Sequence, residues 1–355
     1  MTARRTNICV VCIPGLEHLL VRELRELGII RVKTEHGGVS FKGRFEDVVR
    51  TNIALRGAIR VLVRIAEFGR DKPSLDRLPW EAYLKRSEAV RVGIIDRRRY
   101  GLRGTWPLTT SDVEETLTTL GYRLGDDGLK LWVRFEDERT VVSVDTSGES
   151  LDIHKPERAR WKIAPMRAIV CGSMLHAFGY RGSEPLIVPV GDTGTLLLEA
   201  LGIATGIPRR REREYDFERM AGFAPSMYPN STARELSVRE PPPVVAFYCG
   251  DARPERAIAR IEEAGFGDIV RFVGLAPGEL DPPEAPGLLI VPAAFPLGPD
   301  VVAALNDRYR GWRLGRAVPR RSSGKMAPGL DFEKVASSDH FGRVGRIDFF
   351  LARLS

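Results

Sequence analysis

The chain has 355 residues, of which 43% are hydrophobic, and carries 54 Lys and Arg against 47 Asp and Glu, a net charge of +7. This length and hydrophobic content exclude a globally disordered protein and predict two or three domains. The apolar runs are shorter than the roughly 18 residues of a membrane-spanning helix, and four cysteines are too few for a disulfide scaffold. The first apolar run stops at Pro14 without a cleavage site for a signal peptide. We therefore expect a cytoplasmic protein with no membrane partner.

The positive charge comes mostly from arginine, because the chain has 45 arginines and nine lysines. A planar guanidinium with five donors suits phosphate and nucleic-acid contacts better than an ammonium group does. The charge therefore favours a polyanionic partner. The alternative is that arginine is used in place of lysine because of genome composition.

The first 68 residues predict the element order β-α-β-β-α-β. Strands are expected at 7–13, 31–34, 39–42 and 58–66, and helices at 16–27 and 45–52. The two middle strands flank His36-Gly37-Gly38, which is typical of a hairpin turn. This order is that of the ferredoxin-like split unit. We expect a ferredoxin-like N-terminal domain over 1–68.

The next block, 69–150, contains fewer signals. A short helix is expected around 80–84, a strand at 89–95, a helix at 110–121, and paired strands at 129–135 and 140–145. Residues 151–164 form a basic connector.

Strands and helices alternate in the rest of the chain. Helices are expected at 166–178, 196–204 and 254–264, and strands at 186–190, 244–249, 269–273 and 288–291. A charged, proline-rich insertion interrupts them at 206–243, and strands at about 331–336 and 344–353 should form an antiparallel hairpin. This alternation predicts a Rossmann-like, doubly wound α/β sheet with the hairpin at its edge.

Two segments combine cations with an aromatic residue. They contain Arg97, Arg98, Arg99, Tyr100 and Arg103 in the second block, and Lys155, Arg158, Arg160, Trp161 and Lys162 in the connector. Such segments can hold a phosphate backbone while the aromatic ring stacks on a base, so we expect them to bind RNA. The alternatives are a solvated loop for the first segment and a packing role for Trp161.

A glycine-rich turn follows the strand at 186–190. Gly191, Asp192, Gly194 and Thr195 lead into a helix, and glycine there lets the backbone approach a ligand closely. Asp251, after the next strand, is placed to bind a ribose diol. Cys9 and Cys12 lie three residues apart in a strand and point to opposite faces, so no metal site is predicted.

A series of motifs occurs in a shared order along the chain. They are Pro14-Gly15-Leu16-Glu17, Gly37-Gly38-Val39 with Phe41 and Gly43, residues 143–148, Lys162 with Ala164-Pro165 and Arg167, residues 194–200, and Tyr215 with Phe217-Glu218-Arg219. In these motifs the chain resembles the THUMP-domain class I RNA methyltransferases that depend on S-adenosylmethionine (SAM), particularly the guanine-N2 group acting on rRNA or tRNA.

The resemblance implies a fold, a cofactor and a substrate. The expected fold is multi-domain, α+β and α/β: a ferredoxin-like domain (1–68), a THUMP RNA-binding domain (69–150), the connector (151–164) and a class I methyltransferase-like domain (165–355). SAM would be held by Gly191, Gly194, Thr195 and Asp251, and Phe295 would stack on the target base. The expected reaction is N2-methylation of guanosine in rRNA or tRNA.

The chain departs from the family at three places in this site. The first glycine of the turn is Asp192, and the acid before the turn is Val188. The family's Asn/Asp-Pro-Pro-Tyr/Phe motif is Val291-Pro292-Ala293-Ala294-Phe295, which retains Pro292 and Phe295 as candidate catalytic residues but lacks the side chain that accepts from the target amine. Two hypotheses follow: an active, divergent methyltransferase, or an inactive pseudo-methyltransferase that acts as an RNA-binding factor in ribosome or tRNA maturation.

Overall fold

The structure is a computed structural model that describes residues 5–69, 74–96, 109–136, 139–152, 167–191, 193–207, 213–228, 241–248, 253–320, 327, 329–339 and 345–355. It divides into two compact units. Unit 1 comprises Met1–Cys12, Leu24–Leu151 and Glu212–Asn230, and unit 2 comprises Ile13–Glu23, Asp152–Arg211 and Ser231–Ser355. The sequence-based division placed the segment 212–230 in the C-terminal domain, whereas its contacts group it with unit 1. The four-part division itself stays a prediction.

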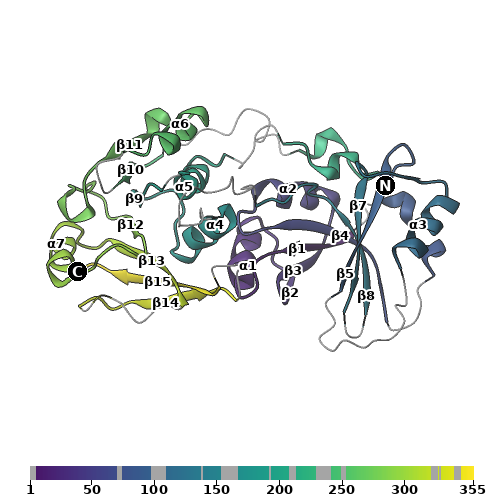
Figure 1. Cartoon of the computed structure of the whole chain (residues 1–355), viewed down its shortest axis with the longest axis horizontal. Coiled ribbons are helices and arrows are strands. Elements are labelled where there is room, and N and C mark those ends of the chain that lie inside the picture. Colours follow the sequence, from purple (N-terminus) through teal and green to yellow (C-terminus); the bar gives the residue numbers. More distant parts are fainter. Residues whose placement is uncertain are drawn as a thin grey trace. The chain divides into compact units, whose positions relative to one another are not determined.

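Unit 1 is built on one eight-stranded sheet (Figure 1). Its elements, including helix α1 that spans the division between the units, are β1 (Thr6–Val11), α1 (Glu17–Glu26), β2 (Val32–Glu35), β3 (Gly38–Gly43), α2 (Phe45–Ala54), β4 (Arg60–Phe68), η1 (Leu75–Arg77), η2 (Trp80–Ala82), β5 (Ala89–Asp96), α3 (Thr110–Thr119), β6 (Arg123–Leu124), β7 (Leu129–Phe135), β8 (Thr140–Asp145), η3 (Asp216–Arg219) and η4 (Pro225–Met227). The strand order is β2-β3-β1-β4-β8-β7-β5-β6, so the ferredoxin-like half (β1 to β4) continues into the second block through the antiparallel pair β4–β8.

Local sequence explains these elements. In β7 the apolar side chains at alternate positions are fully buried while Lys130, Trp132 and Arg134 are only partly buried, as expected of a strand with one core face. Helix α3 begins with a capping box, since Thr109 Oγ1 accepts from Asp112 N and Asp112 Oδ2 accepts from Thr109 N. Helix α2 packs on β1, β3 and β4 and lies above them in Figure 1.

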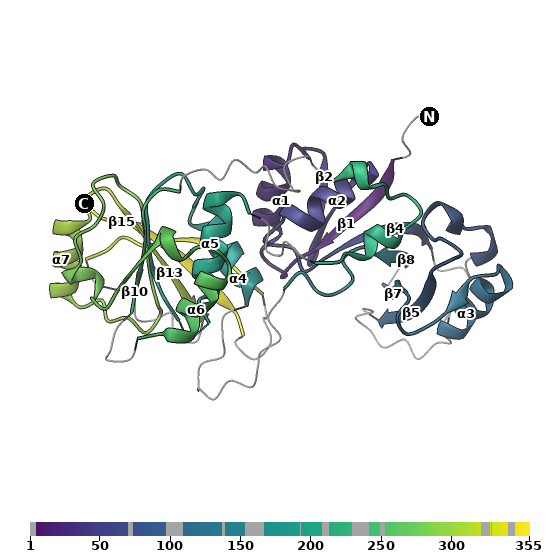
Figure 2. The ribbon, with the colours of Figure 1, turned by 90° about the horizontal axis from the view of Figure 1, so that it is seen from above.

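Unit 2 is built on a seven-stranded sheet. Its elements are α4 (Ala168–Ala177), β9 (Leu186–Pro189), α5 (Thr195–Thr205), β10 (Val244–Phe247), α6 (Glu255–Glu263), η5 (Gly267–Ile269), β11 (Val270–Val273), η6 (Pro277–Glu279), β12 (Leu288–Val291), α7 (Pro299–Arg308), β13 (Arg313–Pro319), β14 (Glu333–Ser337) and β15 (Ile347–Arg353). The strand order is β11-β10-β9-β12-β13-β15-β14, parallel from β11 to β13. Figure 2 shows α4, α5 and α6 on one side of this sheet and α7 on the other.

The antiparallel hairpin β14–β15 lies at the edge of the sheet, with β15 paired to β13. Both the hairpin and its edge position were predicted from the sequence, and both are confirmed. The motif at Pro14-Gly15 is anchored beside β14: Asp339 N donates to Pro14 O at 2.7 Å, and Gly15 has a φ of +90°. A Cβ on Gly15 would lie 2.7 Å from Ser337 O, so only glycine fits there.

The structure contains two long elements that the sequence analysis does not predict, helix α7 and strand β13. The helices and strands that the sequence does predict among the described residues are present, with ends that differ by a few residues. Within the described ranges, no helix has the length and hydropathy needed to span a membrane.

Candidate functional site

The candidate site lies where the order of the parallel strands in unit 2 reverses. From β9 the chain passes to β10 and β11 on one side, and then returns to β12 and β13 on the other. In open α/β sheets, ligands bind beyond the carboxyl ends of the strands at this switch point. The segments after β9 and β12 carry four of the predicted site residues, Gly191, Gly194, Pro292 and Phe295.

The turn after β9 is tied to its neighbours by backbone hydrogen bonds. Val190 N donates to Phe247 O of β10 at 2.9 Å, and Gly194 N donates to Gly191 O at 3.2 Å. Gly194 has a φ of +62°, and a Cβ there would also lie 3.3 Å from the Cβ of Ala257 in α6. Glycine at 194 is therefore explained by backbone conformation and by the close approach of α6.

Gly191 is different, because a Cβ there would meet no described atom within 4 Å. Among the described residues, none fills the space beside Gly191 at the carboxyl end of β9. Thr195 is buried at the first turn of α5, and its Oγ1 lies 2.9 Å from Thr193 Oγ1, while Arg260 of α6 donates to the carbonyl of Thr193. The described residues of the turn thus combine backbone hydrogen bonds, a space that no described atom fills and the positive end of a helix dipole, a combination suited to a ligand with anionic or polar groups.

The loop after β12 is held in a fixed conformation. Phe295 N donates to Pro292 O at 3.0 Å, which closes a turn. Pro292 is exposed, whereas the half-buried ring of Phe295 packs against Phe247, with centroids 6.4 Å apart and an interplanar angle of 73°. This edge-to-face contact joins Phe295 to the core cluster of unit 2.

Arg316 of β13 holds this loop through hydrogen bonds to its backbone. It is 6% exposed, and its Nη2 donates to the carbonyl of Ala293 and, at 3.0 Å, to that of Phe295. Its Nε is buried without a hydrogen-bond partner among the described residues, and burial lowers the pKa of the guanidinium. Burying a cation that is paired only with carbonyl oxygens costs free energy of folding. We therefore expect Arg316 to have a function in positioning this loop.

Sequence analysis did not identify Arg316, since its partners are backbone carbonyls 21 and 23 residues away. The sequence offers no signal for this role, because strand β13 itself was not predicted, and the burial of Arg316 is seen only in the structure.

The other predicted site residues lie outside the described residues. These are Asp192, Asp251, the arginine-rich segment at 97–103 and the connector residues 155–162. Their assignments stay predictions. Cys9 and Cys12 are both buried, and the described ranges contain no cluster of three or more His, Cys, Asp or Glu that could hold a metal.

Residues 7–62 match the family model of the RlmL ferredoxin-like domain. The chain is 28% identical over 238 residues to the ribosomal RNA large subunit methyltransferase K/L of Vibrio cholerae serotype O1, covering 63% of this chain and 33% of the relative. It is 25% identical over 332 residues to the protein of the same name from Methylococcus capsulatus, covering 84% of this chain and 45% of the relative. The chain thus spans between a third and a half of the length of these relatives.

Solved structures resemble the whole chain. A possible methylase from Clostridium difficile 630 superimposes with a TM-score of 0.76 at 18% identity, covering 99% of both chains. SMU.472, a methyltransferase complexed with SAH, gives 0.72 at 18% identity over 98% of both chains. The chain therefore has a ferredoxin-like N-terminal domain followed by an α/β methyltransferase fold, and its similar proteins are methyltransferases.

Proposed function

We propose that the chain is a SAM-dependent RNA methyltransferase that methylates guanosine at N2 in rRNA or tRNA. The observation that carries the proposal is the glycine turn at 191–195, placed at the switch point of a methyltransferase-type sheet with open space beside Gly191. Two further points support it: the named relatives act on large-subunit ribosomal RNA, and residues 7–62 match the model of the RlmL ferredoxin-like domain. The THUMP assignment of 69–150 is part of the same proposal.

The residues present fit a bound SAM. Gly191 leaves room for it, Gly194 and Thr195 form the turn and the helix start beside it, and Asp251 would bind its ribose. When bound, SAM supplies the methyl group. The remaining task of this chain is to hold the guanine amine in line with that methyl group while water is excluded.

The loop after β12 can perform this task without the family's Asn or Asp. The carbonyls of Pro292, Ala293 and Phe295 each accept one hydrogen bond from within the protein. A carbonyl oxygen has two lone pairs, so each can accept one more hydrogen bond, and an amine can donate it. In this proposal a backbone carbonyl of the pinned loop replaces the missing side chain, and the half-buried ring of Phe295 stacks on the base.

The test is calorimetric titration of the full chain with SAM, followed by transfer of labelled methyl groups to large-subunit rRNA and to bulk tRNA. We expect a micromolar dissociation constant and N2-methylguanosine in nucleoside digests of one RNA class. No binding at millimolar SAM would overturn the proposal and favour the inactive RNA-binding factor. A different methylated nucleoside would retain the enzyme and overturn the N2 assignment.

A pair of glycine variants provides the control. A Cβ at Gly191 and a Cβ at Gly69 would both meet no described atom within 4 Å, so the fold should tolerate both substitutions. Gly191→Val fills the space proposed for SAM and should weaken binding by about 10- to 100-fold, the scale of a steric mismatch. Gly69→Val should leave SAM binding unchanged.

A further inference from the structure

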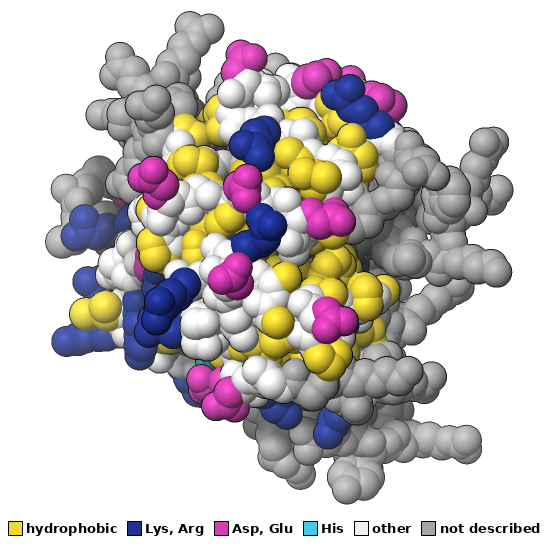
Figure 3. Space-filling model, turned by 90° about the vertical axis from the view of Figure 1, so that its left-hand side faces the viewer, with side chains coloured by type: hydrophobic (Ala, Val, Ile, Leu, Met, Phe, Trp, Pro, Cys, Tyr) yellow, Lys and Arg dark blue, Asp and Glu magenta, His cyan; other side chains and the backbone are white. Residues whose placement is uncertain are grey.

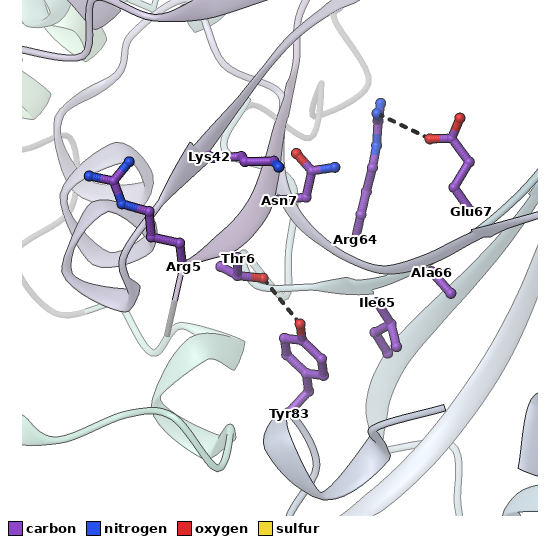
Figure 4. Close-up of a pocket in the computed structure, with 9 residues that line it drawn as sticks. All are labelled: Arg5, Thr6, Asn7, Lys42, Arg64, Ile65, Ala66, Glu67 and Tyr83. Atoms are coloured by element: carbon purple, nitrogen blue, oxygen red, sulfur yellow. Dashed lines mark hydrogen bonds and ion pairs between the residues drawn. The ribbon is translucent and has the colours of Figure 1, made fainter. Parts of the chain in front are cut away.

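Unit 1 contains a cavity of about 470 Å³ that lies against β1, β3 and β4 (Figure 4). Its lining includes Arg5, Asn7, Lys42 and Arg64, with Tyr83 on the opposite wall. Sites for small molecules and nucleotides occupy roughly 300–1,000 Å³, so the cavity exceeds the needs of a bare ion. None of these residues belongs to the candidate methyltransferase site.

The sheet register places an amide between two cations. Asn7 is paired with Lys42 of β3 on one side and with Arg64 of β4 on the other. Directly opposite residues of antiparallel strands point to the same face with Cβ atoms about 4.5–5.5 Å apart. Figure 4 shows the Asn7 side chain between those of Lys42 and Arg64.

The charge of Arg64 is already neutralised. Its two terminal nitrogens donate to the carboxylate of Glu35 at 2.5 and 3.0 Å, and its side chain is 5% exposed. Burial disfavours the charged form, but the hydrogen bonds to Glu35 outweigh burial and raise the pKa of Arg64. Arg64 is therefore a fixed wall of the cavity, held by its partner.

Lys42 and Arg5 are in the opposite situation. Both are exposed, and neither forms an ion pair or side-chain hydrogen bond with another described residue. Glu67 is the one acid among the described residues of the lining. It lies 2.7 Å from Arg139 Nη1 and 3.9 Å from Arg64 Nη1, so its charge is shared by two arginines. The cavity therefore presents two uncompensated cations and an amide donor.

Resting on the proposed function, we propose that this cavity binds a nucleotide of the RNA chain, with its phosphate held by Lys42 and Arg5 and by the amide of Asn7. Three donors of this kind complement the oxygens of a phosphodiester, and the remaining volume admits the attached nucleoside. Thr6 and Asn7 are successive residues of β1 and point to opposite faces of the sheet, so Thr6 Oγ1 and the Tyr83 hydroxyl, 3.3 Å apart, border the cavity from the other face.

The experiment measures binding of a short fluorescein-labelled RNA to the full chain, by anisotropy, between about 50 and 200 mM salt. Lys42→Ala should reduce the slope of log affinity against log salt by about 1 and weaken binding by about tenfold at low salt. Asn7→Ala should weaken binding without changing the slope, because it removes a donor but no charge. Thermal unfolding midpoints should match the wild type, since Lys42 is exposed.

The control is Lys334→Ala, which removes the same charge from an exposed position of β14 in unit 2. If Lys334→Ala and Lys42→Ala lose affinity equally, the effect is one of net charge and the cavity assignment is wrong.

If an acidic peptide of equal charge loses affinity by the same factor in Lys42→Ala, the cavity binds protein anions and the RNA assignment is wrong. RNA binding by the wild type with an unchanged Lys42→Ala slope would overturn this inference alone, whereas no RNA binding by the wild type would overturn the proposed function as well.

Discussion

Glu35 is a partly buried carboxylate, with 15% of its side chain exposed, and its charge depends on two arginines. Besides the two hydrogen bonds from Arg64, Arg139 Nη2 lies 3.5 Å from Glu35 Oε2. Burial favours the neutral carboxyl, but the hydrogen bonds and charge of Arg64, with Arg139 and Ser40 Oγ, lower the pKa of Glu35 from 4.5 to about 2. The pair is therefore ionised at neutral pH, and this keeps Arg64 in place as a wall of the cavity.

This pKa shift predicts an acid-dependent part of the stability. A carboxylate whose pKa is lower in the folded state contributes stability above its unfolded pKa, here 4.5, and loses it as the pH falls through about 2. Glu35→Gln leaves Arg64 buried without its carboxylate and should lower the free energy of unfolding at pH 7 by about 3 kcal/mol. Urea unfolding at a series of pH values would show a shallower loss of stability between pH 4.5 and 2 in the variant than in the wild type.

Glu67→Gln serves as the matched control, because Glu67 also contacts Arg139 but its side chain is 42% exposed. It should cost less than about 1 kcal/mol. If both variants lose the same free energy of unfolding, burial of the Glu35–Arg64 pair does not add to its contribution to stability.

At the scale of elements, strand β13 holds the loop after β12 in place. Arg316 pins the loop at two carbonyls, and Gly315 next to it allows the ring of Phe178 to pack where a Cβ would lie 2.5 Å away. The strand also carries Arg313 at its other end, which donates at 2.6 Å both to the Phe178 carbonyl and to Glu184. One strand thus supports the candidate site from its middle, where Arg316 is paired with Val291 at the end of β12, and the core from its start.

If the pinned loop positions the target amine, loosening it should slow the reaction without affecting SAM. Arg316→Met removes both hydrogen bonds to the loop and should lower kcat by about 10- to 100-fold, the cost of a misplaced reacting group, with less than a twofold change in the SAM dissociation constant. Arg316→Lys, which can still donate to a carbonyl, should restore part of kcat. Single-turnover methyl transfer under saturating SAM would measure these effects.

Arg313→Met is the comparison, since it removes a similar number of hydrogen bonds from the same strand but none from the loop. It should reduce stability and leave kcat unchanged. If kcat falls equally in Arg313→Met and Arg316→Met, Arg316 has no specific role in positioning the loop.

The elements show which signals the sequence carries. Strands β7 and β8 were predicted at their observed bounds, because alternation and an acidic turn mark them clearly. Strand β13 was not predicted, since Gly315 and two arginines interrupt its apolar pattern, and its pairing with β12 and β15 is what makes it a strand. For the site, glycines could be predicted from a local turn, whereas Arg316 depends on contacts between distant parts of the chain.

At the scale of the molecule, the net charge of +7 does not predict where free positive charge lies. On the sheet of unit 1, Arg60 is 2.5 Å from Asp145 and Arg134 is 2.8 Å from Glu136, so these arginines are neutralised where they stand. Figure 3 shows a face of unit 2 on which acidic and basic side chains are interspersed among hydrophobic ones. The uncompensated cations Lys42 and Arg5 are therefore more informative than the total.

The two proposed sites also predict how RNA and SAM affinities respond to mutation. The nucleotide cavity is built from residues of unit 1, and the turn at 191–195 from residues of unit 2. Lys42→Ala should therefore weaken RNA and leave the SAM dissociation constant unchanged, and Gly191→Val should do the reverse. In the double variant, the loss of RNA affinity should equal that of Lys42→Ala and the loss of SAM affinity that of Gly191→Val, each to within about 0.5 kcal/mol, as for independent sites. A coupling energy above about 1 kcal/mol, measured by titrating each ligand into all four proteins, would show that the sites communicate, and the independence argued from their separate residues would then be wrong.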